Sequence, residues 1–460
     1  MLWGMLLVAC GPEHAAEREY AVEVLLGRFL GLEYQLVAGS DRDVVIQLAG
    51  ESDGRRLQVR DDLFRKTAVL LEDAALPQGG LERLPAGAVA GARVLGDLPV
   101  LYGDPSVSVG ENAIDVGVDL FGGAFVMLTR LEEAIPGPRD AHDRFPAAAS
   151  LAVRHGFLDR PIVNEYAEVL WWALQQLWPG LIRKQRSFRV LPTCDVDWPF
   201  YSRGRLVESV FKGVRDVYTR RDKSLAAARV RSARAIRRGG RSVDPANTFD
   251  FIMDLSEQHG LQSAFYFMTR HADPHFDADY SIDDPWVRNL LREIAARGHE
   301  VGLHPSYTTY RSEDALRTEL DRLRQACVAE DVPSERIGGR QHFLRWTNPT
   351  TWQAWESVGL AYDSTLGFSE AVGFRCGACY EFPVFDLVER RTLMLVERPL
   401  VAMEVSLLNH AGATPHEAAE AMRRLKETCR SVDGDFTFLW HNNHLITEQN
   451  RTAYAAVLEP

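Results

Sequence analysis

The stretch Thr-Cys-Asp-Val-Asp-Trp-Pro at residues 193–199 places two carboxylates two positions apart, after an apolar run and before a proline. Because residues i and i+2 of a strand project to the same side, Asp195 and Asp197 are expected to point together from a strand end. Two carboxylates held that close repel each other unless a cation lies between them or one carries a proton. The pattern therefore predicts either a metal-assisted hydrolytic site, with one metal ligand and one base, or a turn that caps the strand.

The composition is that of an ordinary soluble protein with two domains. The chain has 460 residues, 46% of them hydrophobic and 25% charged, and exceeds one ordinary domain. Its net charge of −12 argues against general binding of nucleic acid. Six cysteines without framework spacing suit a reducing compartment. No run reaches the roughly 18 apolar residues of a membrane span, and residues 1–10 are expected to form a buried strand, so we expect a cytoplasmic protein.

Two regions with different patterns divide the chain near residue 185. Residues 1–185 mix short strand patterns with helical ones and are expected to form a smaller α/β domain of unknown role. From 186 to 460, strand-like and helical runs alternate, which predicts a parallel α/β sheet or barrel with its functional groups at the carboxyl ends of the strands. The strand-like runs are residues 187–190, 264–268, 300–303, 362–365 and 436–439, and the helical runs include 286–297 and 313–330.

A basic segment interrupts this acidic chain. Residues 201–245 hold 13 Lys or Arg residues against four acidic residues, in a register that predicts an inserted helical arm. Such an arm either presents a solvated basic face or docks onto an anionic partner, which could be an anionic sugar, an acidic protein or a membrane surface.

Histidines and an arginine follow two further expected strands. In residues 298–307 the alternation leaves His304 at the exit of the strand, where either a metal ligand or a structurally satisfied histidine would fit. In residues 339–346 the i and i+2 spacing places Arg340 and His342 on one strand face.

Three more segments supply reactive side chains. The i and i+2 spacing also puts Leu439 and His441 on one face near the end of the last expected strand. Asp363 lies in the strand-like run at 362–365, and Arg375 lies on a loop flanked by glycines.

The order and content of these motifs resemble the polysaccharide deacetylase superfamily, which is carbohydrate esterase family 4 with the nodulation-factor deacetylase homology region. Five motifs match in order between residues 186 and 445. The resemblance implies a distorted (β/α)-barrel and a divalent metal that assists removal of N- or O-acetyl groups from amino sugars. We therefore expect a barrel of deacetylase type at 186–460, preceded by the smaller α/β domain at 1–185.

The resemblance also implies roles for individual residues. The first motif would supply the base and one metal ligand, the second motif another ligand, and the last motif the acid. By resemblance, Asp195 is the general base, Asp197 and His304 are metal ligands, Arg340 orients the base, Asp363 tunes the catalytic histidine, Leu439 lines the acetyl-methyl pocket and His441 is the general acid.

Two positions depart from the family pattern. The second motif normally carries another histidine four residues after the first, and here that position is Thr308. In the third motif, a proline is usual two residues after the arginine, and here that position is His342. Because catalytic zinc generally takes three protein ligands, we hypothesise that His342 supplies the missing imidazole. The alternative is that His342 orients the base or hydrogen-bonds the substrate.

The first half of the chain also resembles a known region. Residues 119–132, 144–146 and 155–161 are similar to a domain of unassigned function found upstream of such deacetylases. That pairing is associated with bacterial polysaccharide-biosynthesis loci, which suggests a setting without naming a substrate.

These observations together predict a hydrolase that removes an acyl group, most simply an N-acetyl group, from a sugar or polysaccharide precursor. Zn²⁺ is the expected metal, held by Asp197, His304 and His342. Tyr307, Arg375 and Trp346 are expected to contact the carbohydrate together with Leu439. Two alternatives remain: a metal-independent amide hydrolase on the same fold and a non-catalytic carbohydrate-binding protein.

Overall fold

The computed structural model describes residues 4–39, 43–200 and 244–460, together with scattered positions between 210 and 240. These residues form two compact units. Most of the basic arm expected at 201–245 lies outside the described residues. Unit 1 comprises Met1–Arg189, Trp346–Val401 and Leu425–Phe436, and unit 2 comprises Val190–Arg345, Ala402–Arg424 and Thr437–Pro460.

This division differs from the two domains expected from the sequence. The first boundary falls at Arg189, close to the expected position, but residues 346–401 and 425–436 group with unit 1 instead of with the C-terminal region. Hydrogen bonds within unit 1 explain the difference. The Asn348 side-chain amide donates to the carbonyls of Thr129 at 2.8 Å and Arg130 at 3.0 Å. These hydrogen bonds join segments more than 200 residues apart, so the local periodicity of the sequence could not predict them.

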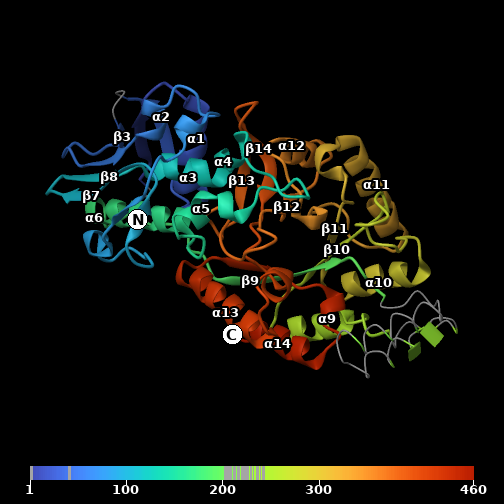
Figure 1. Cartoon of the computed structure of the whole chain (residues 1–460). Helices are drawn as coiled ribbons and strands as arrows, with labels where there is room; N and C mark the ends of the chain where they lie inside the picture. Colours follow the sequence, from blue (N-terminus) through green and yellow to red (C-terminus); the bar gives the residue numbers. More distant parts are fainter. Residues whose placement is uncertain are drawn as a thin grey trace. The chain divides into compact units, whose positions relative to one another are not determined.

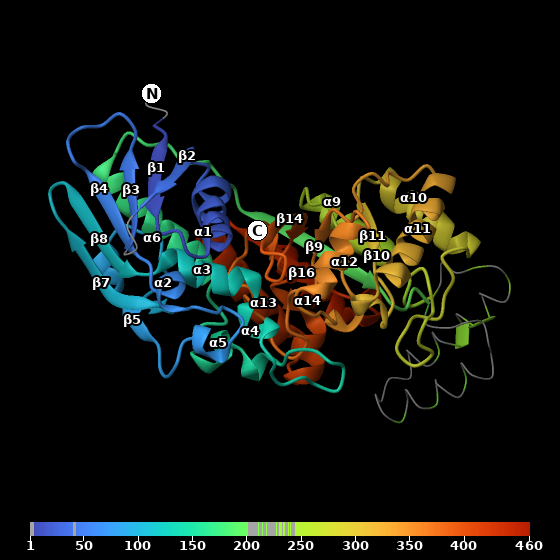
Figure 2. The ribbon, with the colours of Figure 1, turned by 90° about the horizontal axis from the view of Figure 1, so that it is seen from above.

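Unit 1 contains a six-stranded mixed sheet with the strand order β2-β1-β3-β4-β8-β7 (Figures 1 and 2). The first strand is buried, as the sequence predicts, because Leu6 and Val8 have no exposed surface. Burial alternates along β3, as expected for a strand with one face on the core. The strands are β1 Leu6–Cys10, β2 Tyr34–Ala38, β3 Asp43–Leu48, β4 Arg56–Arg60, β7 Gly103–Val109 and β8 Ala113–Val118.

Three helices build the core of unit 1 beside this sheet. Helices α1 (Ala15–Val22) and α6 (Ile162–Leu177) each contact α3 (Leu120–Thr129), and α6 also contacts β4 and β8. Helix α3 begins at a capping residue, since the Asp119 carboxylate accepts a hydrogen bond from the Gly122 backbone N–H at 2.7 Å.

A second, three-stranded sheet of unit 1 has the order β12-β14-β13. Strand β12 (Tyr362–Asp363) runs parallel to β14 (Arg391–Glu397), and β13 (Phe382–Asp386) runs antiparallel to β14. Helix α12 (Thr350–Ser357) packs on β13 and β14.

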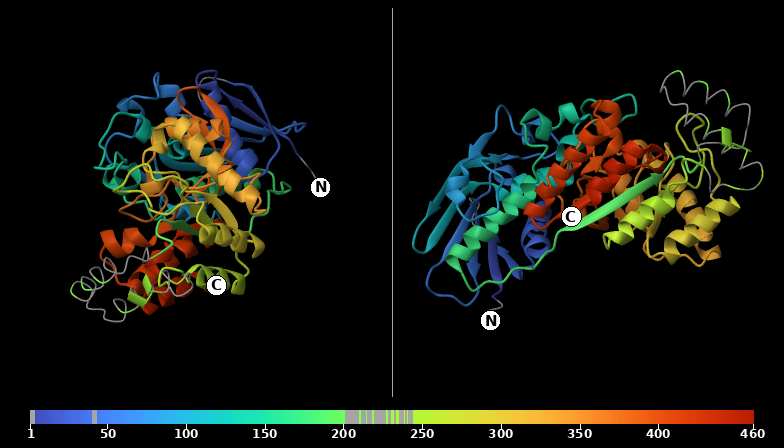
Figure 3. Two further views of the ribbon diagram at one scale, coloured as in Figure 1. Left: turned by 90° about the vertical axis from the view of Figure 1, so that its right-hand side faces the viewer. Right: turned by 90° about the horizontal axis from the view of Figure 1, so that it is seen from below.

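Unit 2 contains a five-stranded sheet in the order β11-β10-β9-β16-β15. Its residues read as continuous buried runs, which is typical of parallel strands covered on both faces. The longest strand is β9, green in Figure 3, and it pairs in parallel with β10, so that Asp195 lies opposite Tyr266. The strands are β9 Arg189–Val196, β10 Ala264–Phe267, β11 Glu300–Leu303, β15 Ala402–Met403 and β16 Asp435–Leu439.

Helices follow the strands of unit 2 as the alternation predicts. Helices α10 (Pro285–Ala296) and α11 (Glu313–Ala329), yellow to gold in Figure 3, contact each other, and α10 contacts β11. Helix α9 (Phe249–Gln258) contacts α14 (Glu448–Leu458).

The expected closed barrel is not present in the described residues. Beyond β11 the sheet is extended by a single parallel bridge between Leu303 and Gly339. The strand expected at 362–365 does form as β12, but it pairs with β14 in the separate sheet of unit 1. The fold of the described chain is therefore mixed α/β with an open parallel sheet in unit 2.

The remaining elements are short, apart from one long helix. They are α2 Leu63–Lys66, α4 Leu131–Ala134, α5 Leu151–Arg154, α13 Pro415–Ser431, β5 Glu82–Leu84, β6 Leu98–Val100, two π-helical turns at Glu23–Phe29 and Ser406–His410, and 3₁₀ turns at Asp73–Ala75, Ala86–Val89, Ala147–Ala149, Thr309–Arg311, His342–Leu344 and Asn442–His444. Within the described ranges, no helix is both long enough and apolar enough to cross a membrane.

Candidate metal centre and active site

Reactive side chains gather at the carboxyl ends of the parallel strands in unit 2. Asp195 and Asp197 lie at the end of β9, His304 directly follows β11, Glu404 directly follows β15, and His441 lies two residues after β16. Because parallel strands end at the same edge of a sheet, this is the edge where a functional site is expected.

A close backbone approach adds two more side chains to this edge. Gly339 lies so near β11 that a Cβ atom there would fall 1.9 Å from the Leu303 carbonyl oxygen. Only glycine permits this approach. The Arg340 backbone N–H then donates to the same carbonyl at 3.1 Å, and Arg340 and His342 lie beside the end of β11.

Three imidazoles face the carboxylate of Asp197. The Nε2 atoms of His304 and His342 lie 3.1 Å and 3.7 Å from Asp197 Oδ1, and the Nε2 of His441 lies 3.5 Å from Asp197 Oδ2. The structure thus brings together the three residues expected as metal ligands, Asp197, His304 and His342, and the residue expected as the acid, His441.

Each of these imidazoles is held at its other nitrogen. The Nδ1 of His304 lies 2.6 Å from the Arg340 carbonyl oxygen. The Nδ1 of His342 lies 3.1 Å from Asp277 Oδ1, and the Nδ1 of His441 lies 2.6 Å from Glu404 Oε1. These acceptors require a proton on Nδ1, which in neutral rings of His304 and His342 leaves the Nε2 lone pair directed at the site.

The turn that carries His342 has an unusual backbone. Phe343 and Leu344 both adopt left-handed conformations, with φ values of 61° and 53°. Bulky residues pay about 1–2 kcal/mol each for this conformation. The Phe343 ring packs edge-on against His342 at 4.7 Å and against Tyr307 at 5.3 Å. Strain of this kind is held by surrounding packing and is common at functional sites.

The donor set of Asp197, His304 and His342 fits a divalent cation. One ligand atom of each residue lies within 4.8 Å of the others. Asp197 Oδ1 and His304 Nε2 are buried and have no hydrogen-bond partner among the described residues. Buried polar atoms rarely stay unsatisfied, so two such atoms facing each other indicate a missing partner. One carboxylate and two neutral imidazoles are a donor set that Zn²⁺ takes in catalytic sites.

The carboxylate of Asp195 is held by Arg340 and lies beside one of the imidazoles. The Arg340 Nη1 donates to Asp195 Oδ1 at 2.8 Å and to the Thr193 hydroxyl at 2.9 Å, and the guanidinium is fully buried. The other carboxylate oxygen, Oδ2, lies 3.8 Å from His304 Nδ1. The Arg340 guanidinium therefore holds Oδ1 of Asp195, the expected base, in place.

The electrostatics of the site separate acidic from basic groups. Burial by itself raises the pKa of the Asp197 carboxyl, but its interactions with His342 and His304 outweigh burial and hold that pKa well below its usual range. Burial alone lowers the pKa of an imidazole, yet the neighbouring Glu404 raises the pKa of His441 to about 10. His441 therefore carries a proton at neutral pH, as a general acid must.

Glu404, and not Asp363, is the carboxylate that contacts His441. Asp363 lies on β12 in unit 1, fully buried, and accepts hydrogen bonds from the backbone N–H and hydroxyl of Thr365. Glu404 holds His441 by this contact, whereas β12, which carries Asp363, pairs with β14 instead of joining the sheet of unit 2.

Two of the four residues expected to contact substrate, Arg375 and Trp346, lie in unit 1 and not in unit 2. Arg375 is buried in unit 1 with its Nε donating to Glu133 at 2.9 Å and its Nη1 donating to the Gly367 carbonyl at 2.7 Å. Trp346 is 1% exposed and packs on Trp352. Full burial leaves neither of them surface for a carbohydrate, so both assignments are corrected to structural roles.

The other two expected substrate residues lie in unit 2. Leu439 is the last residue of β16, and Tyr307 lies in the loop after His304. The Tyr307 ring stacks on Phe276 with centroids 4.3 Å apart, and the Arg345 guanidinium lies 3.9 Å from the ring centroid on a face of Tyr307.

The sequence did not single out Asp277 or Glu404. Asp277 lies on a loop without a motif, and Glu404 follows a strand of only two residues. The run Leu-Val-Ala-Met-Glu at 400–404, apolar and then acidic, was the available signal for Glu404. Asp277 had no comparable signal.

Comparisons with known proteins match the N-terminal region to one family model and find solved structures that are similar to the chain. Residues 6–179 match a family of unknown function, DUF7033. No protein with curated annotation matches the chain by sequence.

Several solved structures are similar to this chain. A protein described as a polysaccharide deacetylase from Mycobacterium smegmatis is 18% identical, with 59% of this chain and 82% of that chain covered and a TM-score of 0.37. One described in the same way from Pseudomonas aeruginosa PAO1 is 12% identical, with 61% and 85% covered and a TM-score of 0.37. Puue allantoinase is 12% identical, with 70% and 90% covered and a TM-score of 0.35.

Proposed function

We propose that unit 2 is a metal-assisted hydrolase that removes an acyl group, and in the first place an N-acetyl group, from a sugar or polysaccharide precursor. The observation that carries the proposal is the meeting of three imidazole Nε2 atoms at Asp197, beside a second carboxylate fixed by Arg340. The choice of a carbohydrate amide comes from the resemblance of the five motifs to polysaccharide deacetylases.

Asp197, His304 and His342 would hold the metal. When bound at such a donor set, a divalent cation polarises the substrate carbonyl and lowers the pKa of a water molecule. Asp277 and the Arg340 carbonyl support the site by fixing the ring orientation of the two histidines.

The proposed base and the proposed acid lie in the same site but have different neighbours: Arg340 holds the base, and Glu404 holds the acid. Asp195, held by the hydrogen bond from Arg340, would take the proton of the attacking water. His441, protonated because Glu404 raises its pKa, donates a proton to the leaving nitrogen. Leu439, the last residue of β16, is 1% exposed, and its assignment to the acyl-methyl pocket rests on the resemblance of the fifth motif alone.

Metal content is the experiment that tests the donor set. We would measure it by elemental analysis on protein purified without added ions or an affinity tag. The wild type would be compared with Asp197→Ala, His342→Ala and the control His416→Ala, whose side chain is 83% exposed. We expect about one metal per chain in the wild type and the control, and loss in both site variants.

The other outcomes separate the alternatives. Loss of metal only in Asp197→Ala would keep the metal and reject His342 as a ligand. A wild type without metal after incubation with Zn²⁺ would contradict the proposal. Chelator-resistant activity would then favour a metal-independent amide hydrolase, and binding of glycans without turnover would favour a carbohydrate-binding protein.

Acetate release from acetylated glycans tests the chemistry. With oligomers of N-acetylglucosamine and O-acetylated polysaccharides as the panel, Asp195→Asn and His441→Ala should each lower kcat by ~10²–10⁴-fold while the fold is retained. Wild-type rates in both variants would contradict the roles of acid and base.

A further inference from the structure

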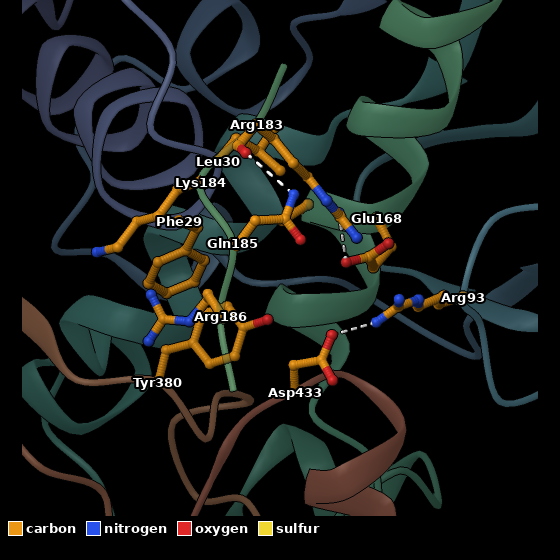
Figure 4. Close-up of a pocket in the computed structure, with 11 residues that line it drawn as sticks. Phe29, Leu30, Arg93, Glu168, Arg183, Lys184, Gln185, Arg186, Tyr380 and Asp433 are labelled. Atoms are coloured by element: carbon orange, nitrogen blue, oxygen red, sulfur yellow. Dashed lines mark hydrogen bonds and ion pairs between the residues drawn. The ribbon is translucent and has the colours of Figure 1, made fainter. Parts of the chain in front are cut away.

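Unit 1 has a pocket outside the candidate site that the proposed chemistry does not use. It lies where residues 183–186 pass the end of the turn at Glu23–Phe29, and Lys184 donates its backbone N–H to the Leu30 carbonyl at 2.7 Å (Figure 4). Its lining includes Arg93, Glu168, Arg183, Arg186, Tyr380 and Asp433.

The pocket holds more positive than negative charge. Arg183 forms an ion pair with Glu168 at 2.7 Å, and Arg93 forms one with Asp433. Within the described part of the chain, no carboxylate lies within ion-pair distance of Lys184 or Arg186. Four cations against two carboxylates leave two positive charges unbalanced, in a chain whose net charge is −12.

Arg186 is held in place by an aromatic ring instead of a carboxylate. Its guanidinium carbon lies 3.7 Å from the centroid of the Tyr380 ring, and Tyr380 packs edge-on against Phe29 at 4.8 Å. Stacking orients the planar group and leaves its in-plane N–H donors available for a carboxylate or phosphate. In the view of Figure 4, the charged ends of Lys184 and Arg186 lie on the same side of the segment, away from the Arg93–Asp433 pair.

We infer that this pocket binds an anionic group of a glycan, either a phosphate ester or a uronate carboxylate, through Lys184 and Arg186. A guanidinium oriented by stacking is suited to a bidentate anion, and an anion there would offset the excess of cations over carboxylates in the lining. The glycan as carrier rests on the proposed function, whereas the anion itself rests on the pocket alone.

Binding of two anionic probes by isothermal titration calorimetry at low ionic strength tests this inference. The probes are sodium pyrophosphate and polygalacturonate, with neutral dextran as the blank. Wild type is compared with the double variant Lys184→Ala/Arg186→Ala and with Arg65→Ala/Lys66→Ala. The second pair removes two cations of unit 1 that lie outside the pocket and are paired with Asp62.

We expect at least one anionic probe to bind the wild type and the control pair, and the pocket variant to bind it about tenfold or more weakly. Binding of pyrophosphate alone would identify a phosphate ester, and binding of polygalacturonate alone would identify a uronate. Absence of binding by both probes, or equal weakening in the two double variants, would overturn the inference. Should the double variant fail to fold, as checked by circular dichroism, Arg186→Gln replaces it with the same expectation.

The same titration on Asp195→Asn separates this inference from the proposed function. Anion binding by unit 1 should persist in that variant, because Asp195 belongs to the chemistry of unit 2. A chain that binds the anion but releases no acetate would therefore retain the pocket and lose the hydrolase. A chain that releases acetate but binds neither probe would support the hydrolase and reject the anion pocket.

Discussion

His342 shows how one residue can be inferred from the loss of another. The sequence lacks a histidine at Thr308 and has an additional one at His342, and the structure places the latter 3.7 Å from Asp197. The replacement of one histidine by another could be predicted because Thr308 and His342 both lie inside recognisable motifs. Glu404 and Asp277 could not be predicted in this way, since they orient histidines from segments without a motif.

Asp277→Asn tests whether His342 needs its carboxylate partner. The Asp277 side chain accepts the Nδ1–H of His342 and fixes which nitrogen faces the site. Loss of such a partner typically lowers metal affinity by about 10- to 100-fold, so we expect a weaker Zn²⁺ affinity in competition with a chromogenic chelator. Asp321→Asn, at an exposed position of α11, serves as the control. An unchanged affinity in Asp277→Asn would argue that His342 is not a ligand.

Glu404→Gln tests the acid. Glu404 raises the pKa of His441 to about 10, which keeps the imidazole protonated at neutral pH. Removing the negative charge lowers that pKa, so the alkaline limb of the kcat profile should move to lower pH and the rate at pH 8 should fall. The profile of kcat between pH 5 and pH 10 measures this. A limb that stays in place would mean that another group is the acid.

At the scale of elements, the strands carrying motifs were predictable and their pairing was not. The expected runs at 187–190, 264–268, 300–303 and 436–439 overlap β9, β10, β11 and β16. Their apolar content and the alternation with helices are local properties of the sequence. The pairing of β12 with β14 depends on contacts between distant segments, and local patterns cannot distinguish it from closure of a barrel.

A buried carboxyl on α11 supports the loop that follows His304. Glu319 has no exposed surface, and it accepts hydrogen bonds from the Ser306 backbone N–H at 2.9 Å and from the Ser306 hydroxyl. Gln341 joins the same loop through the Ser306 carbonyl at 3.1 Å and the Thr309 hydroxyl at 2.6 Å. The loop between two candidate metal ligands is thereby tied to a helix.

Glu319→Gln should change how stability depends on pH. Burial raises the pKa of Glu319 to about 7, although the two Ser306 donors oppose the shift. A carboxyl with a raised folded-state pKa contributes stability that is fully present below its unfolded pKa, about 4.3, and is lost as pH rises through about 7. Glutamine cannot ionise, and its amide can serve Ser306 as both acceptor and donor.

The free energy of unfolding of the wild type should therefore fall relative to Glu319→Gln by about 1–3 kcal/mol between pH 5 and pH 8. Urea denaturation at both pH values measures the difference. Exposed Glu420→Gln on α13 is the control and should follow the wild type. Parallel curves for wild type and Glu319→Gln would show that Glu319 is ionised throughout this range.

At the scale of the whole molecule, unit 1 is assembled from three separate stretches of chain. A buried ion network joins two of them: Glu133 accepts from Arg130 Nε at 2.8 Å and from Arg375 Nε at 2.9 Å, and all three side chains are at most 2% exposed. From the sequence, Arg375 was expected to contact substrate, since it lies on a loop between glycines. Its partner Glu133 is 242 residues away in the chain, and no local pattern reveals that pairing.

Glu133→Ala should destabilise unit 1 by about 3–5 kcal/mol, because it leaves two buried guanidinium groups with fewer partners. Urea denaturation followed by the fluorescence of the buried tryptophans of unit 1 measures the loss, with exposed Glu389→Ala as the control. Arg375→Ala and the double variant Glu133→Ala/Arg375→Ala complete a double-mutant cycle. Its coupling energy measures the interaction between Glu133 and Arg375. A large coupling would show that residues 346–401 are held to the N-terminal stretch by this network. A change in Glu133→Ala no larger than in the control would assign the cohesion of unit 1 to apolar packing alone, and residues 346–401 would then be expected to tolerate an apolar replacement of the whole network.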